Sequence, residues 1–389
     1  MIGEFSFRYN DVVLHFGVGV LKKIFTRVVS GHSNALVISS RTAARVSGAL
    51  EDVTSALRSA GVSYIVYDKI LPNPDTETAD TVIDIAKREN VDLVIGIGGG
   101  SVIDVAKVVS LAATTELRSI DLIRGSKQTR ASADTLKLVA VNLTHGTGSE
   151  VNRFAVLTVK GTIEKRGFTA RYPDVSFDDP YYTRTLDRKQ SIYTSLDAFY
   201  HAYESATSRR TNIMVSSLAQ IAITHIVESL PKVLEDPGCI ELRARLLYAS
   251  MIAGVAVDIA GGSHLNHALE HGFSGLQPKL PHGAGLAMFG PMVIYYTHKA
   301  VPEVSARLLK ALDPSIKPIS DDAEKARKIV DDFQKSIGFS ERLSDYGISE
   351  KDVAPVLDFV ERTIVERYHA NIPFTVSRGM LERIVLSVL

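Results

Sequence analysis

Two short segments of the sequence combine a carboxylate and several imidazoles at spacings that suit a divalent metal. Asp197 and His201 stand four residues apart, so on a helix both side chains project from the same face, one turn apart. His267 and His271 repeat that spacing, and His282 follows between a proline and a glycine. We therefore expect a metal site built from these segments, with either a structural or a chemical role.

Size and composition are those of a globular protein large enough for two domains. The chain has 389 residues, of which 45% are apolar and 23% are charged, and its formal net charge is zero. A zero net charge argues against nucleic acid as a partner, because phosphate binding needs an excess of Lys and Arg.

Cysteine usage and hydropathy favour the cytoplasm. Cys239 is the single cysteine, so no disulfide can form within the chain and a cysteine-built metal site is excluded. The N-terminal residues hold no apolar core of signal-peptide length, and no apolar stretch approaches the roughly 20 residues of a membrane span. We expect a cytoplasmic protein that does not enter a membrane.

The first half of the sequence alternates between strands and helices, and the second half is helical. Apolar, β-rich runs occupy residues 34–40, 62–68, 91–98 and 136–144. Helical periodicity separates them at residues 42–61, 76–90 and 101–114, and after residues 177–187 it continues without β-rich runs. This order predicts a Rossmann-like α/β domain with a mostly parallel sheet over residues 1–180, followed by an all-α domain over residues 181–389.

A glycine-rich turn joins the third predicted strand to the helix that follows it. The N–H groups at a helix N-terminus form an anion site, and Gly98, Gly99 and Gly100 would let a diphosphate approach the backbone. Ser101 either caps the helix or donates to a phosphate oxygen, and Val102 completes the candidate site. Ser101 also replaces the third glycine of the strict dinucleotide fingerprint, so a plain strand-to-helix turn is the alternative.

A second polar loop follows the fourth predicted strand. Thr144, His145 and Thr147 lie in it, and its glycines permit an unusual backbone path. Two such loops at the carboxyl ends of parallel strands favour a ligand crevice over two ordinary turns. We therefore assign these three residues to cofactor binding.

The first predicted strand bears on the choice between NAD and NADP. It ends at Ser39, Ser40 and Arg41, and no acidic residue follows until Glu51. An acidic residue near such a strand end binds the ribose 2′-hydroxyl of NAD, whereas an arginine accommodates the 2′-phosphate of NADP. NADP(H) is therefore slightly preferred over NAD(H), and the equal alternative is that Arg41 merely begins a surface helix.

Five motifs, taken in chain order, resemble the iron-containing (group III) alcohol dehydrogenases. They are GGGSVIDVAK (98–107), HGTGSEV (145–151), LDAFYHAYE (196–204), HALEHGFSG (267–275) and PHG (281–283). The resemblance implies a Rossmann-like domain followed by a dehydroquinate synthase-like helical domain. It also implies a homodimer or a larger homo-oligomer.

Residue by residue, the resemblance implies four metal ligands, namely Asp197, His201, His267 and His282. Three imidazoles and one carboxylate suit Fe²⁺ or Zn²⁺, whereas Mg²⁺ and Ca²⁺ prefer oxygen ligands alone. His264 is a competing candidate, but His267 is favoured by its helical spacing to His271.

The resemblance also places residues around the cofactor. It implies that Asn73 and Lys165 lie by the cofactor, and that His271 lies near the nicotinamide without binding metal. Because a histidine pKa can approach neutrality, we expect His271 to take part in a proton path to solvent.

The predicted function is a metal-dependent, NAD(P)-linked alcohol dehydrogenase or aldehyde reductase. The metal would polarise the oxygen of a small alcohol or carbonyl substrate, and hydride would pass to or from C4 of the nicotinamide. One alternative is a glycerol phosphate dehydrogenase-like or dehydroquinate synthase-like enzyme, although residues 195–205 lack the basic side chains that an anionic substrate needs. A non-catalytic nucleotide- or metal-binding protein is the other.

Overall fold

The computed structural model describes residues 2–125 and 135–389, which form two compact units. The first unit comprises Met1–Gly161, Lys165–Asp187 and Pro237–Leu247. The second comprises Thr162–Glu164, Arg188–Asp236 and Tyr248–Leu389. The predicted boundary at residue 180, with a cofactor domain before it and a metal domain after it, stays a prediction.

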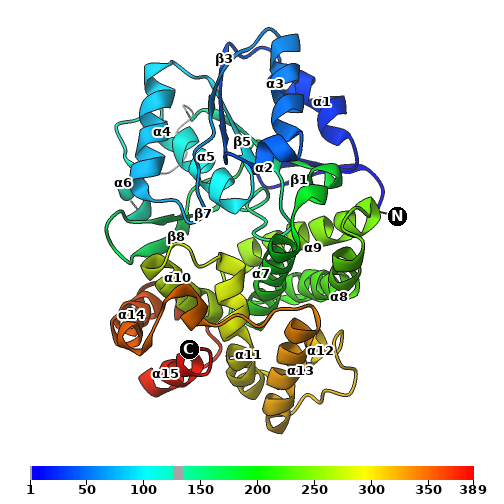
Figure 1. Cartoon of the computed structure of the whole chain (residues 1–389), viewed down its shortest axis with the longest axis vertical. Coiled ribbons are helices and arrows are strands. Elements are labelled where there is room, and N and C mark those ends of the chain that lie inside the picture. The colour runs from blue at the N-terminus through cyan, green and yellow to red at the C-terminus, as the bar shows by residue number, and fades with distance from the viewer. Residues whose placement is uncertain (1, 126–134) are drawn as a thin grey trace. The chain divides into compact units, whose positions relative to one another are not determined.

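A mostly parallel sheet is the centre of the first unit (Figure 1). Within the described residues its seven strands lie in the order β1 (Phe5–Tyr9), β2 (Val12–Phe16), β9 (Val175–Asp178), β6 (Lys137–Asn142), β5 (Leu93–Gly98), β3 (Asn34–Ser39) and β4 (Ser63–Tyr67). All neighbours are parallel except β1 and β2, which form an antiparallel pair. β7 (Phe154–Thr158) and β8 (Lys165–Thr169) form a separate antiparallel ribbon.

Helices cover both faces of this sheet (Figure 1). α1 (Val20–Val29), α2 (Ala43–Val46) and α3 (Ala49–Ser59) share one core with Ala35 and Val37 of β3. α4 (Thr76–Arg88), α5 (Gly100–Ala112) and α6 (Ser119–Ile123) share the other with Leu36 and Ile38. Alternate residues of one strand thus enter opposite cores, as expected of a sheet buried on both faces. The predicted α/β fold class is confirmed.

One predicted helix is interrupted. The segment 42–61, which has helical periodicity, forms two helices, α2 and α3, with Gly48 between them at a φ of 85°. A left-handed backbone conformation ends a helix, and glycine adopts it without steric cost. Helical periodicity therefore predicted the conformation of this segment but not the break at Gly48.

The strand order brings three of the predicted cofactor loops to one edge of the sheet. The chain passes from β3 to β4 on one side and then to β5 on the other, so a topological switch point lies between β3 and β5. Ser39 pairs with Ile97, and Gly98 pairs with Asn142. The carboxyl ends of β3, β5 and β6 are therefore adjacent, at the position where open α/β sheets bind ligands.

Two buried carboxyl groups of the first unit keep protons to an unusually high pH. Glu150 and Asp178 are both 0% exposed. Burial raises the pKa of Glu150 to about 7, against the opposing effect of Lys107. Burial, reinforced by the charge of Glu150, raises the pKa of Asp178 well above its usual value.

We expect these groups to make stability fall as the pH rises. Between the unfolded pKa of Glu150, 4.5, and its folded value of about 7, the folded chain holds more protons than the unfolded chain, so the free energy of unfolding decreases with pH. Glu150→Gln should gain stability relative to the wild type across this range, by at most about 1.4 kcal/mol per pH unit. Urea unfolding at several pH values measures this, with the exposed Glu116→Gln as control. Parallel stability curves for the wild type and Glu150→Gln would contradict it.

The second unit is helical. Its main helices are α7 (Arg188–Thr207), α8 (Ile213–Glu235), α10 (Leu265–Leu276), α11 (His282–Ala300), α12 (Pro302–Leu309), α13 (Ala323–Ser336), α14 (Glu350–Thr363) and α15 (Arg378–Leu386). α9 (Ile240–Ala260) contributes its residues from Tyr248 onward. Shorter turns lie at η3 (Ser320–Asp322), η4 (Leu343–Tyr346) and η5 (Ile364–Tyr368), and η2 (Pro180–Thr185) belongs to the first unit.

One helix corrects the expectation that no segment reaches the length of a membrane span. Among the described residues, α8 is long and apolar enough to cross a bilayer, with a mean hydropathy of 1.5. α9 and α10 reach that limit only together, as a pair bent by 103°. α8 buries Val215, Ala219 and Ile223 completely, as the core helix of a globular unit does.

Candidate metal centre and cofactor loops

Helix α7 presents the first two predicted metal ligands from the interior of the second unit. From Ser191 to Thr207 nearly every side chain of α7 is buried, and small residues such as Ala198 and Ala202 leave room for neighbouring helices. Asp197 is 3% exposed and His201 is 9% exposed. His201 Nδ1 lies 3.2 Å from Asp197 Oδ1, so the expected proximity of this i, i+4 pair is observed.

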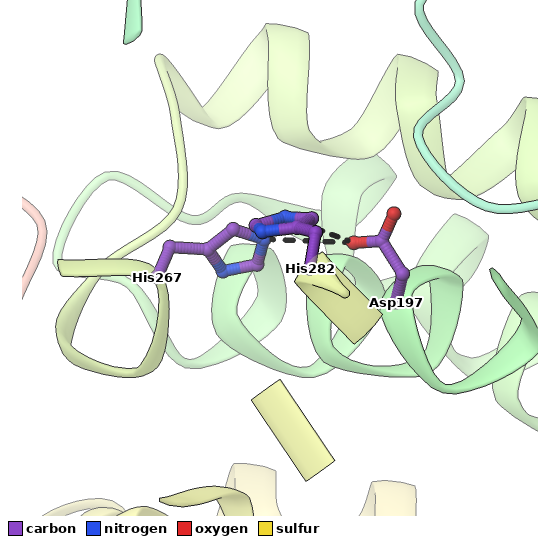
Figure 2. Close-up of side chains that lie close together, drawn as sticks. All are labelled: Asp197, His267 and His282. Carbon is purple, nitrogen blue, oxygen red and sulfur yellow. Dashed lines mark ion pairs between the residues drawn. The ribbon is translucent and has the colours of Figure 1, made fainter. Parts of the chain in front are cut away.

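Two further helices bring their histidines to the same carboxylate oxygen. His267 is in the first turn of α10, and His282 begins α11. Their Nε2 atoms lie 3.8 Å and 3.6 Å from Asp197 Oδ1. Figure 2 shows both rings directed toward that carboxylate. Three helices therefore place one carboxylate and three imidazoles around a common point.

Gly283 explains how α11 approaches α7 closely enough. A Cβ atom built on Gly283 would lie 2.0 Å from the carbonyl oxygen of Tyr193 on α7, a distance that no side chain can occupy. Gly283 therefore lets the two backbones meet, and His282, the residue before it, reaches Asp197. The PHG motif thus encodes a helix contact as well as a candidate ligand.

The donor atoms of this cluster fit a metal ion. Among the described residues, Asp197 Oδ1, His201 Nδ1 and His267 Nε2 are buried and have no hydrogen-bond partner. Buried polar atoms without partners are costly, and a cation removes that cost. Ligands about 2.1 Å from a tetrahedral metal lie roughly 3–4 Å apart, and the separations of 3.2, 3.6 and 3.8 Å fall in that range.

The charges of Asp197 and His201 also suit a cation, whereas Glu204 and Asp197 raise the pKa of His267 to about 9 against the effect of burial, so that ring must lose a proton to bind a metal. Burial alone would raise the pKa of Asp197, but His201 and His282 lower it to about 2, so the side chain is a carboxylate. Burial lowers the pKa of His201 to about 4, so its ring is neutral and carries a lone pair. Zn²⁺ and Fe²⁺ bind to carboxylate and neutral imidazole groups of this kind.

Glu204 supports the cluster from α7, and the sequence analysis missed it. It is 0% exposed, and its carboxylate contacts Nδ1 of His267, the ring nitrogen that faces away from Asp197. It also accepts a 2.6 Å hydrogen bond from the backbone N–H of Asn266. Burial would raise the pKa of Glu204, but His264 and His267 hold it well below its usual value. A carboxylate in this position fixes the orientation of a metal-binding histidine.

Glu270 supports His282 in the same manner. Its carboxylate, also 0% exposed, contacts Nδ1 of His282 while Nε2 of that ring faces Asp197. The signal for both glutamates was present in the sequence, because each lies three residues after a predicted ligand, His201 or His267. The rule that a metal-binding histidine needs a second partner identifies them.

The remaining two histidines of this region have distinct positions. His264 precedes α10, with its Nδ1 2.9 Å from Glu204 and its Nε2 3.0 Å from Thr207 Oγ1, so both of its nitrogens are engaged. His271 is 5% exposed, and its Nδ1 lies 3.2 Å from the hydroxyl of Tyr368. His267, favoured over His264 from the sequence, is the one beside Asp197.

In the first unit, the glycine loop after β5 packs against the polar loop after β6. A Cβ atom on Gly99 would meet the side chain of Thr144 at 2.8 Å, and one on Gly100 would meet Thr147 at 2.5 Å. A Cβ atom on Gly98 would likewise meet the side chain of Val102, at 2.5 Å. From the sequence, these glycines were expected to admit a diphosphate. In the structure, Gly99 and Gly100 also leave room for the side chains of Thr144 and Thr147. The hydroxyl groups of these threonines therefore lie beside the N-terminus of α5.

A buried charged network fixes this arrangement and was also missed. Lys107 of α5 is 0% exposed and donates hydrogen bonds to Ser149 Oγ at 2.7 Å and to the carbonyl of Phe154 at 2.6 Å. Asp104, one turn earlier, accepts from Ser149 Oγ at 2.6 Å and from the backbone of Val156 at 2.9 Å. An Asp and a Lys at i, i+3 inside an otherwise apolar helix were the available signal.

The other predicted cofactor residues are placed as follows. Lys165 donates a 2.8 Å hydrogen bond to Asn73, so these two lie together, and Asn73 has a left-handed backbone with a φ of 53°.

His145 is fully buried, with its Nε2 3.2 Å from the guanidinium of Arg243. Burial and the charge of Arg243 lower the pKa of His145 to about 3. His145 therefore supports its loop as a neutral ring.

The residues at the end of β3 differ in exposure. Ser39 is 0% exposed, Ser40 is half-buried, and Arg41 is exposed after the strand has ended. A carboxylate the sequence analysis had not considered, Asp68, follows β4 and accepts a 2.7 Å hydrogen bond from Arg45. Ser101 is half-buried in the first turn of α5.

Comparison with known proteins covers both units. The model of the iron-containing alcohol dehydrogenase family matches residues 12–180, and the C-terminal model of the Fe-containing alcohol dehydrogenase family matches residues 191–385. The chain is 33% identical to the long-chain primary alcohol dehydrogenase of Thermoanaerobacter ethanolicus, with 95% of this chain and 94% of that protein covered. It is 28% identical to a probable NADH-dependent butanol dehydrogenase of Bacillus subtilis (strain 168), with 98% and 97% covered.

A solved structure agrees with these matches. An archaeal halo-thermophilic alcohol dehydrogenase from a Red Sea brine pool superimposes with a TM-score of 0.89 at 28% identity, with 97% of this chain and 96% of that chain covered. Fold and matches together define an oxidoreductase that acts on alcohols. The chain belongs to the iron-containing alcohol dehydrogenase family, which the sequence motifs had predicted. Membership supports a metal and a nicotinamide as cofactors.

Proposed function

We propose that this enzyme interconverts small alcohols and the corresponding carbonyl compounds, with NAD(P) as the hydride carrier. The observation that carries the proposal is the cluster around Asp197, where buried donor atoms of α7 and α10 have no hydrogen-bond partner among the described residues and His282 Nε2 of α11 lies 3.6 Å from Asp197 Oδ1. A protein has no structural need for such a cluster unless a cation completes it.

The proposed metal ligands are Asp197, His201, His267 and His282, and the proposed metal is Fe²⁺ or Zn²⁺. Glu204 and Glu270 hold the rings of His267 and His282 in their binding orientation. When bound, a divalent metal supplies a Lewis acid that polarises an alcohol or carbonyl oxygen.

The proposed cofactor contacts lie on the first unit. The N-terminus of α5, at Gly98 to Val102, offers its backbone N–H groups to the diphosphate. Thr144 and Thr147 add hydroxyl groups beside it, His145 buttresses their loop, and Asn73 with Lys165 forms a further polar pair. The nicotinamide accepts or donates the hydride.

A slight preference for NADP(H) is part of the proposal. Arg41 is exposed after β3, and Ser39 and Ser40 provide no carboxylate that would repel a 2′-phosphate. The test is kcat/KM with NADPH against NADH, for the wild type and for Arg41→Ala. A wild type that favours NADPH and loses that advantage in Arg41→Ala supports the preference. A wild type that favours NADH overturns it and leaves the alcohol dehydrogenase activity unaffected.

The function itself is tested by metal analysis and a substrate panel. Purified enzyme is loaded with Fe²⁺ or Zn²⁺ and given primary alcohols, diols, aldehydes and glycerol phosphate with each nicotinamide, and absorbance at 340 nm is followed. We expect metal-dependent turnover of small alcohols or aldehydes. Turnover of glycerol phosphate alone, or no turnover in any metal-loaded sample, would overturn the proposal.

We expect His271→Ala to lower turnover without removing the metal. Its ring lies beside the cluster, T-shaped to His267 with 6.3 Å between centroids, but it is not one of the proposed ligands. If the His271 ring moves the substrate proton to or from solvent, its loss lowers kcat by about 10²-fold. Kinetics together with metal analysis measure both effects, with His32→Ala, from the first unit, as control. A metal-depleted His271→Ala variant would argue against this role.

Two properties complete the proposal, namely a cytoplasmic location and a homodimeric or larger assembly. The single cysteine, Cys239, suits a reducing compartment.

The assembly is supported by exposed apolar residues of α8. Ile213, Met214 and Ile221 are 83%, 53% and 42% exposed, and a surface of this kind favours contact with another subunit. Light scattering of the purified protein tests the assembly, and a monomer at micromolar concentration would overturn it.

A further inference from the structure

A π-helical turn follows α14, near the proposed metal centre. It spans Ile364–Tyr368 and is closed by a 2.8 Å hydrogen bond from the backbone N–H of His369 to the carbonyl of Ile364. Such wide turns strain a helix and occur often at functional sites, because they turn a particular side chain to a new direction. The side chain at the end of this turn is Tyr368.

The segment after the turn is anchored, so Tyr368 is not a loose chain end. Asn371 is 3% exposed, and its Nδ2 donates hydrogen bonds to the carbonyls of Gly262 and Ser263 at 3.1 Å and 3.0 Å. Its own carbonyl accepts a 2.9 Å hydrogen bond from the backbone N–H of Arg209. α14 on one side and Asn371 on the other therefore fix the position of Tyr368.

The hydroxyl of Tyr368 lies 3.2 Å from Nδ1 of His271. The other nitrogen of that ring, Nε2, lies 3.9 Å from the carboxylate of Glu270. If Glu270 is ionised, it favours a hydrogen on the nitrogen that faces it, which makes Nε2 the protonated nitrogen and Nδ1 the acceptor. Tyr368 is then the donor, since its hydroxyl is the group that faces Nδ1.

We propose that Tyr368 is a positioning residue that acts through His271. Its hydroxyl donates to Nδ1, which holds the imidazole in one orientation and as the Nε2–H tautomer beside the metal cluster. This role rests on the proposed function of His271 in catalysis. It adds a residue that no sequence motif indicated, since Tyr368 lies 85 residues beyond the last motif at 281–283.

The first test reads the tautomer rather than the activity. Histidine labelled with ¹⁵N is introduced into the metal-free enzyme, the His271 signals are assigned with His271→Ala, and long-range proton–nitrogen spectra are compared between wild type and Tyr368→Phe. We expect the Nε2–H form of His271 in the wild type and a mixture of the two tautomers in Tyr368→Phe. An unchanged tautomer in Tyr368→Phe would overturn the proposal, whatever the activity of the enzyme.

The second test is a double-mutant cycle of Tyr368→Phe and His271→Ala in the metal-loaded enzyme. Tyr368→Phe alone should lower kcat about tenfold with unchanged metal content and substrate KM, and it should have no effect in the His271→Ala background. An equal loss in both backgrounds would show that Tyr368 acts without His271. Tyr181→Phe, which removes an exposed phenol, is the control.

The two tests separate this inference from the proposed function. If His271→Ala keeps full turnover, the proposed catalytic role of His271 fails. The tautomer measurement then still decides whether Tyr368 positions the ring.

Discussion

Replacing Asp197 by alanine should abolish metal binding and activity together. Its Oδ1 atom is the point that His201, His267 and His282 share, and three buried imidazoles without it are a poor cation site. If the metal contributes several kcal/mol to the transition state, activity falls by about 10³-fold or more. Metal content by mass spectrometry and turnover at 340 nm measure the two losses.

The matched control is Asp332→Ala, which removes an exposed aspartate from helix α13. It should keep the metal and the activity. Circular dichroism shows whether Asp197→Ala is still folded, and chelator treatment of the wild type should reproduce the loss without a mutation. Full activity in folded Asp197→Ala would refute the ligand assignment.

Gly283→Ala is expected to be nearly as damaging, although glycine and alanine differ by one methyl group. The new Cβ would lie 2.0 Å from the carbonyl oxygen of Tyr193, so the start of α11 must move away from α7. His282 moves with it and leaves Asp197. We expect a destabilisation of about 1–3 kcal/mol from overpacking and a metal affinity that is lower by about 10- to 100-fold.

Chelator competition and urea unfolding measure these two effects. Gly379→Ala is the matched control, because Gly379 lies in helix α15 and nothing comes within 4 Å of a Cβ built there. The same substitution at that position should stabilise the protein slightly, since alanine favours a helix. If Gly283→Ala kept the wild-type metal affinity, close contact of α7 and α11 would not be what positions His282.

The sequence predicted which side chains of the proposed metal centre lie together better than it predicted their surroundings. Asp197 with His201 and His267 with His271 were detectable because helical spacing alone places such side chains together. Glu204 and Glu270 were missed because a glutamate in a helix is usually solvated, and only the three-dimensional packing shows that both are fully buried. Tyr368 could not be predicted, since the direction of its side chain depends on a π-helical turn that has no sequence signature.

The strands, too, were only partly predicted from the sequence. β3, β5 and β6 were predicted because both of their faces are buried and their sequences are continuously apolar. β1, β2, β7 and β8 were missed, since they are five residues each and none of them is buried along its whole length. The break between α2 and α3 depends on a single glycine, whose backbone conformation periodicity does not reveal.

The support of the metal centre passes from helix to helix. Glu204 on α7 holds His267 of α10, and Glu270 on α10 holds His282 of α11, whose ring faces Asp197 on α7. A chimera that takes one of these helices from a relative therefore keeps the centre only where that relative supplies the same partner residues, which makes α7, α10 and α11 one module for recombination.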